Sequence, residues 1–121
     1  MTMFKRIVTS VLTFATLATT AVGGITASAA AGSVTTGSGY ATLTNTSGTT
    51  RYGIVSLQVV NRNTGATVAR TSNEGVLTNY SSVTATASGY SAVTYRFNGS
   101  GTLYNGTSPW TGAYWSGSSS Y

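Results

Sequence analysis

Side chains that could do acid–base or nucleophilic chemistry are scarce in this chain. The 121 residues contain no histidine and no cysteine, and Glu74 is the one acidic residue. A carboxylate pair, a Ser-His-Asp triad, a Cys-His pair and a histidine-based metal site all need groups that this composition lacks. The many serines have no base to activate them. We therefore expect a protein that is not an enzyme and that holds no cofactor or metal.

Positive charge and aromatic rings are the groups left for binding a partner. Beyond residue 30 the chain has four arginines and one glutamate, a net charge of +3. A weak positive field favours anionic surfaces such as bacterial envelopes, whereas four scattered arginines are too few to follow nucleic acid. Tryptophan and tyrosine near the C-terminus suit a partner, a glycan or a membrane interface, or they fold back over the domain. The candidate surface-binding residues are Arg51, Arg62, Arg70, Arg96, Trp110, Tyr114 and Trp115.

The first thirty residues have the three parts of an export signal. Lys5 and Arg6 form a basic start, residues 7–22 are apolar or small and uncharged, and Ala27-Ser28-Ala29 is a small-x-small cleavage pattern. We expect cleavage after Ala29 or Ala30, and a secreted product with no membrane span in the mature chain. The alternative is a membrane anchor, for which the run is short and diluted by threonine.

The stretch Gly53 to Ser72 is the best-defined structural element of the sequence. Val55, Leu57 and Val59 alternate with polar residues, which is the period of a half-buried strand. A second alternating arm follows the turn residues Asn61-Arg62-Asn63-Thr64-Gly65, where asparagine and glycine tolerate left-handed backbone angles. The pattern predicts a β-hairpin.

The rest of the chain predicts further strands separated by glycine, asparagine and serine turns. Alternation indicates strands over 40–44, 82–87 and 90–97, the last with Val93, Tyr95 and Phe97 facing inward. Turn-forming residues predict breaks at 72–75 and 98–101. We therefore expect an all-β fold, an antiparallel sandwich or small barrel of about five to seven short strands. The expected organisation is a signal peptide over 1–30, a flexible leader over 31–39, the β domain over 40–106 and an aromatic Gly/Ser-rich tail over 107–121.

The hairpin also carries a resemblance to a known family. The run Val59-Val60-Asn61-Arg62-Asn63-Thr64-Gly65, followed by Arg70-Thr71 and Gly75-Val76, resembles secreted bacteriocins of the lactococcin 972 type over Ser56 to Phe97. The resemblance implies an unmodified, cysteine-free, all-β polypeptide that interferes with septum formation through the cell-wall precursor lipid II. The absence of histidine and the long Ser/Gly/Tyr tail depart from the family's pattern.

Two functions of different classes remain open. In the first, the chain is a secreted antagonist that acts at the bacterial envelope, attracted by its arginines and inserting its aromatic rings. In the second, it is a structural or adhesive surface protein whose uncharged strands pair between molecules into a homo-oligomer.

Overall fold

The computed structural model describes residues 19–21, 24–28 and 31–121, with side chains from residue 31 onward. Most of the predicted signal peptide, 1–30, lies outside the described residues. Within the described ranges the regular elements are β-strands and the short 3₁₀ helix η2 (Pro109–Thr111), so the predicted all-β fold is confirmed. No helix in this part of the chain is long and apolar enough to cross a membrane.

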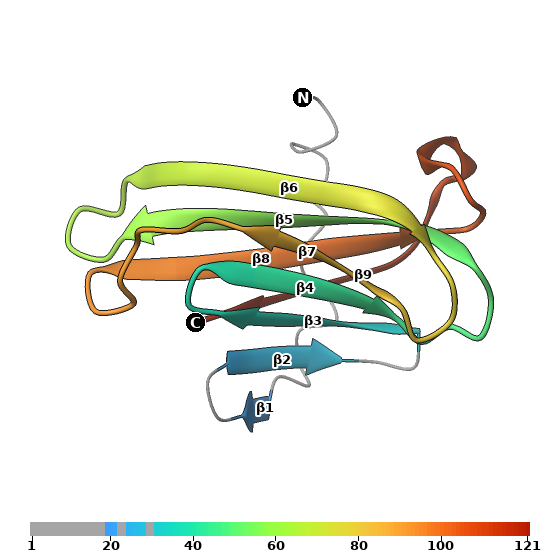
Figure 1. The fold of residues 1–121 in the computed structure, drawn as a ribbon, viewed down its shortest axis with the longest axis horizontal. Coiled ribbons are helices and arrows are strands. Elements are labelled where there is room, and N and C mark those ends of the chain that lie inside the picture. Colours follow the sequence, from blue (N-terminus) through green and yellow to red (C-terminus); the bar gives the residue numbers. More distant parts are fainter. Residues whose placement is uncertain (1–18, 22–23, 29–30) are drawn as a thin grey trace.

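The strands form two antiparallel sheets that pack face to face as a sandwich (Figure 1). The first sheet has the order β1 (Thr19–Ala21), β2 (Gly24–Ser28), β3 (Gly32–Gly37), β4 (Tyr40–Asn45) and β7 (Ser82–Thr86). The second has the order β6 (Thr67–Leu77), β5 (Arg51–Asn61), β8 (Tyr95–Tyr104) and β9 (Ala113–Ser120).

The predicted hairpin is the pair β5–β6. Val55, Leu57 and Val59 are all fully buried, as their alternation predicts. In the connecting loop the Asn61 side-chain oxygen accepts hydrogen bonds from the backbone N–H groups of Asn63 (2.8 Å) and Thr64 (3.1 Å), and Gly65 has a φ of 76°. Asparagine and glycine therefore shape this turn in the predicted way.

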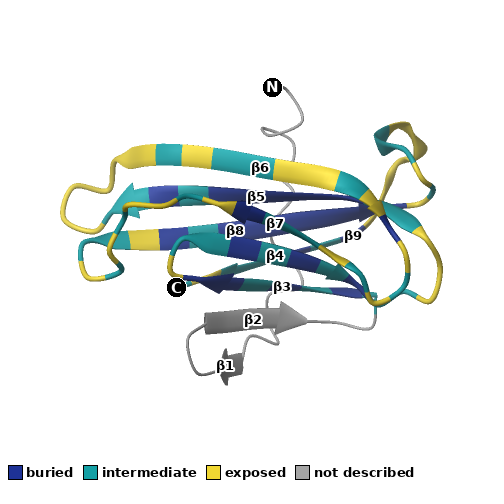
Figure 2. Ribbon diagram, in the orientation of Figure 1, coloured by how far each residue is buried: buried dark blue, intermediate teal, exposed yellow. Residues whose placement is uncertain are grey.

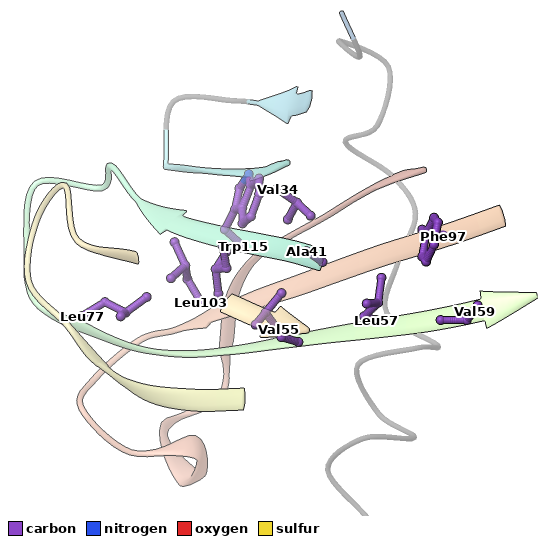
Figure 3. Packing of buried hydrophobic residues seen from close by; sticks show 11 residues of the cluster. Val34, Ala41, Val55, Leu57, Val59, Leu77, Phe97, Leu103 and Trp115 are labelled. Carbon is purple, nitrogen blue, oxygen red and sulfur yellow. The ribbon is translucent and has the colours of Figure 1, made fainter. Parts of the chain in front are cut away.

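The core lies between the two sheets and takes side chains from both (Figure 3). Figure 2 shows buried positions alternating with partly exposed ones along β3 and β4. Each strand from β3 to β9 contributes at least one buried side chain to this core. Its buried members are Val34, Ala41, Leu43, Val55, Leu57, Val59, Leu77, Ala85, Phe97, Leu103 and Trp115.

The turn predicted at 98–101 is wrong, because β8 runs through it as a central strand. Gly99 and Gly101 are buried and face the first sheet. A Cβ atom on Gly101 would lie 2.9 Å from Cδ1 of Leu43, which is closer than packed atoms normally approach. These glycines therefore make room for the facing sheet and do not turn the chain.

The flexible leader predicted over 31–39 is also wrong, because it contains β3 and part of the core. Val34 and Thr36 are fully buried, and the Thr36 and Ser119 hydroxyl oxygens lie 2.7 Å apart in a hydrogen bond between the sheets. Only alternate residues of such a strand need to be buried, so its small, polar composition conceals it. The sandwich therefore includes β3, which lies before the predicted start of the domain at residue 40.

Two further boundaries differ from the prediction. β6 continues without a break through 72–75, paired along its length with β5. Val93, predicted to face inward, is 88% exposed. It lies in a turn closed by backbone hydrogen bonds from Thr94 and Tyr95 to the Ser91 carbonyl, and β8 begins only at Tyr95. Phe97 is fully buried, as predicted.

Candidate functional site

The segment 107–121, predicted to be a tail outside the domain, is instead part of the sandwich. It contains η2 and then β9, which pairs with β8 at the edge of the second sheet. Trp115 is only 5% exposed and packs in the core, so the prediction that it binds at the surface is wrong. In β9 it follows Tyr114 and precedes a run of serine and glycine, which gives no alternation of large and polar residues to read.

The remaining two aromatic candidates lie with Arg51 at one end of the sandwich, and we call Arg51, Trp110 and Tyr114 the aromatic tip. Trp110 is 83% exposed and Tyr114 is 47% exposed. Trp110 belongs to η2, which Figure 1 shows protruding at the end where β8 and β9 are connected. Exposed aromatic side chains gathered in this way are typical of binding surfaces.

Hydrogen bonds hold the tip loop, residues 105–112, in one shape. The Asn105 side-chain amide donates to the carbonyls of Thr111 (3.1 Å) and Gly112 (3.2 Å). The Thr111 hydroxyl donates to the Ser108 carbonyl (2.7 Å) and accepts from the Gly106 N–H (2.8 Å). Trp110 lies between these anchored residues, so its backbone is fixed while its ring faces solvent.

Arg51 connects Tyr114 and the tip loop to the rest of the second sheet. Its guanidinium carbon lies 3.5 Å from the centre of the Tyr114 ring, a cation–π contact. Its Nε donates to the Ser47 hydroxyl (2.7 Å), and one terminal nitrogen donates to the carbonyls of Tyr104 (3.3 Å) and Asn105 (3.1 Å). Arg51 is therefore committed to positioning the tip, in contrast to the freely steering cation that the sequence suggests.

The other three candidate arginines lie elsewhere, and we call Arg62, Arg70 and Arg96 the basic group. All three are exposed. Arg62 follows β5 and donates from Nε to the carbonyls of Ala92 (3.0 Å) and Tyr95 (3.2 Å). The 11 residues of β5 separate Arg51 from Arg62 by roughly 35 Å, at about 3.3 Å per residue. The structure thus brings Arg51 to the aromatic candidates and leaves the basic group apart from them.

Charge is confined to one layer of the described sandwich. All four arginines and Glu74 lie on the strands of the second sheet or its hairpin loop. In the first sheet, the face turned away from the core carries hydroxyl groups in cross-strand pairs. Thr42 and Thr84 hydroxyls lie 2.8 Å apart, and those of Thr44 and Ser82 lie 2.7 Å apart. The two faces of the molecule therefore differ sharply in chemistry.

Glu74 has a partner that sequence reasoning missed, the phenol of Tyr52. Both residues lie on the face of the second sheet opposite Val55, and Tyr52 contacts Tyr104 edge-to-face with ring centroids 6.0 Å apart. Partial burial, and then the hydrogen bond to Glu74 and its negative charge, raise the pKa of Tyr52 to about 12. Tyr52 lies opposite Val76 and Glu74 lies opposite Ile54, so the two are diagonal neighbours on adjacent strands, and no local sequence pattern predicts their contact.

Comparison with known proteins leaves the function to be argued from this geometry. No protein-family model, curated protein or solved structure matches the chain. Among the described residues there is also no cluster of three or more His, Cys, Asp or Glu that could hold a metal ion. The resemblance to the lactococcin 972 type stays a prediction from the hairpin sequence.

Proposed function

We propose that this protein is a secreted, non-enzymatic, bacteriocin-like β-sandwich that acts at the bacterial cell envelope, with the aromatic tip as its binding element. The observation that carries the proposal is Trp110, which is 83% exposed on a loop held by hydrogen bonds from Asn105 and Thr111. A loop already held in one shape loses little conformational entropy when its exposed side chain docks. Tryptophan is also favoured where membrane meets water.

The basic group supports the same target by a different route. Arg62, Arg70 and Arg96 are exposed and would be attracted to anionic lipid or wall polymer. The basic group lies apart from the aromatic tip. We therefore expect these arginines to attract and orient the protein at the anionic surface, and the tip to make the inserted contact. Binding that depends on Trp110 and weakens with salt is the expected signature.

Vesicle binding by the purified secreted protein tests the proposal. Vesicles of phosphatidylcholine, with and without phosphatidylglycerol and with and without lipid II, would be compared by co-sedimentation, and the same samples would be spotted on lawns of Gram-positive bacteria. Trp110→Ala should lower binding at least tenfold and abolish clearing of the lawn. Val93→Ala removes a side chain that is 88% exposed on a different loop and is the matched control. Equal binding and equal clearing by both variants would exclude the tip as the binding element.

A second function, a self-associating structural or adhesive protein, is favoured by a separate observation. The described strands of the first sheet carry no charged side chain, and charge is what commonly keeps sheet edges from pairing between molecules. Sedimentation across a concentration series separates the two functions. Assemblies that grow with concentration and leave lawns intact would favour the structural role, and a discrete small species that clears them would favour antagonism.

A further inference from the structure

The edge of the first sheet depends on a strand that export would remove. β3 pairs with β4 on one side and with β2 on the other, in a register that places Thr26 opposite Thr35 and Ser28 opposite Ser33. β2 (Gly24–Ser28) lies N-terminal to the predicted cleavage after Ala29 or Ala30. Signal-peptide cleavage would therefore leave the mature chain with β3 as an unpaired edge.

Nothing in β3 protects that edge from a new partner. Natural sheets block edges with charge, proline or bulges, and Gly32–Gly37 has no charged residue, no proline and no shift in its register with β4. The strand is also held in place from the second sheet. The Ser119 hydroxyl donates to the Val34 carbonyl (3.0 Å), and the Thr36 hydroxyl donates to the Ser119 carbonyl (3.3 Å). β3 would thus remain extended after β2 is lost.

The opposite edge of the same sheet is already occupied. β7 packs beside β6, and the Asn73 side-chain amide donates to the Thr84 carbonyl of β7 (3.0 Å). The exposed strand β6 carries Arg70 and Glu74, the kind of charges that discourage pairing. Of the two edges of the first sheet, β3 is therefore the one that cleavage would leave open as an uncharged backbone ladder.

We propose that, in the exported and cleaved protein, β3 pairs antiparallel with β3 of a second copy through a two-fold axis at Thr35. This inference rests on the proposed export. Directly opposite residues of antiparallel strands lie on the same face, so a two-fold register must pass through a residue and not between two. The axis at Thr35 sets threonine opposite threonine, as β2 does with Thr26, and sets Val34 opposite Thr36 of the partner copy.

A second copy suits this edge because the paired sheets would meet without like charges. The charges of the described chain all lie on the strands of the second sheet or its hairpin loop, away from β3. The new sheet would run in the order β7-β4-β3 and then β3-β4-β7 of the partner copy. It would continue the cross-strand row that joins Thr35, Thr42 and Thr84 within each copy.

A cysteine cross-link tests the pairing directly, since the chain has no cysteine of its own. Directly opposite residues of antiparallel strands have Cα atoms about 4.5–5.5 Å apart, which a disulfide can span. Secreted Thr35→Cys protein should form a disulfide-linked dimer under mild oxidation. Thr86→Cys, at an exposed position of β7 on the same face, is the matched control and should stay monomeric on a non-reducing gel.

Sedimentation and N-terminal sequencing of the secreted product complete the test. The wild-type product should begin at residue 30 or 31 and sediment as a dimer, and Thr35→Lys should sediment as a monomer with an unchanged circular dichroism spectrum. Thr86→Lys should remain dimeric. A cleaved wild-type monomer, or equal cross-linking by both cysteine variants, would overturn the pairing while leaving export intact. A product that retains Met1 would overturn the proposal together with its premise, whereas vesicle binding tests the envelope function independently.

Discussion

Arg51, the first residue of β5, makes a cation–π contact with Tyr114 of β9, with 3.5 Å between the guanidinium carbon and the ring centre. The same guanidinium also bonds the end of β8, so one side chain connects three strands of the second sheet with the tip loop. The tip is therefore an extension of the sheet. Its orientation follows from the position of Arg51.

Replacing Arg51 by lysine should loosen the tip without unfolding the sandwich. Lysine keeps the charge but lacks the planar fork that stacks on Tyr114 and bonds Ser47 and Tyr104 together. The expected cost is about 1 kcal/mol of unfolding free energy, with faster proteolysis in 105–112. Denaturant unfolding and limited proteolysis measure both, and Arg96→Lys is the control. Equal protease resistance in the two variants would show that Arg51 does not order the tip.

The two tryptophans should respond oppositely to truncation. Trp115→Ala removes a core side chain and should cost about 3–5 kcal/mol, which would unfold many small domains. Trp110→Ala removes a side chain that is 83% exposed, so the thermal midpoint should stay within a few degrees of wild type. Thermal denaturation, monitored by circular dichroism, measures the midpoints of both variants. A large loss of stability in Trp110→Ala would mean that this ring has a structural role and would weaken the envelope proposal.

Glycine in the central strand should be essential where the sheets meet. Gly101→Ala brings a methyl group to within 2.9 Å of Leu43 and 3.0 Å of Val34, and such overpacking costs about 1–3 kcal/mol. Gly75→Ala is the matched control, since a Cβ atom there would meet nothing within 4 Å beyond its own chain neighbours. Denaturant midpoints of the two variants give the comparison. If Gly101→Ala is as stable as Gly75→Ala, the sheets are not packed as closely as the structure has them.

The glycines of β8 mark the limit of what the sequence could predict. Val55, Leu57 and Val59 are bulky and alternate strictly, so their strand and its buried face could be predicted from local pattern alone. Gly99 and Gly101 look like turn residues, and their role becomes visible only when the facing sheet is in place, with Ala41 against Gly99 and Leu43 against Gly101. Local chemistry predicts what a residue can do, and the packing of distant strands decides which of these roles it takes.

The candidate site divides in a similar way. The types of Arg51, Trp110 and Tyr114 identified them as binding candidates, but their proximity depends on β9 returning alongside β8, which no local pattern predicts. The sequence also predicts a surface position for Trp115, because the residues after it are as rich in serine and glycine as a loop. Its burial follows from the alternation of β9, in which Trp115 and Gly117 face the core side.

Tyr52 should make the stability of the protein depend on pH in the alkaline range. Its pKa rises from 10.0 to about 12 in the folded state, so between these values the unfolded chain binds fewer protons than the folded one. Stability should therefore fall as pH increases from about 10 to 12, because unfolding releases the Tyr52 proton.

The protein has eight tyrosines, and Tyr52→Phe isolates the contribution of this one. Denaturant unfolding at intervals across that range should give a shallower loss for Tyr52→Phe than for wild type. Glu74→Gln removes the charge that helps to hold the phenol protonated, and should move the high-pH part of the tyrosinate absorbance, to which Tyr52 contributes, toward lower pH. Parallel stability curves for wild type and Tyr52→Phe would contradict the raised pKa of Tyr52.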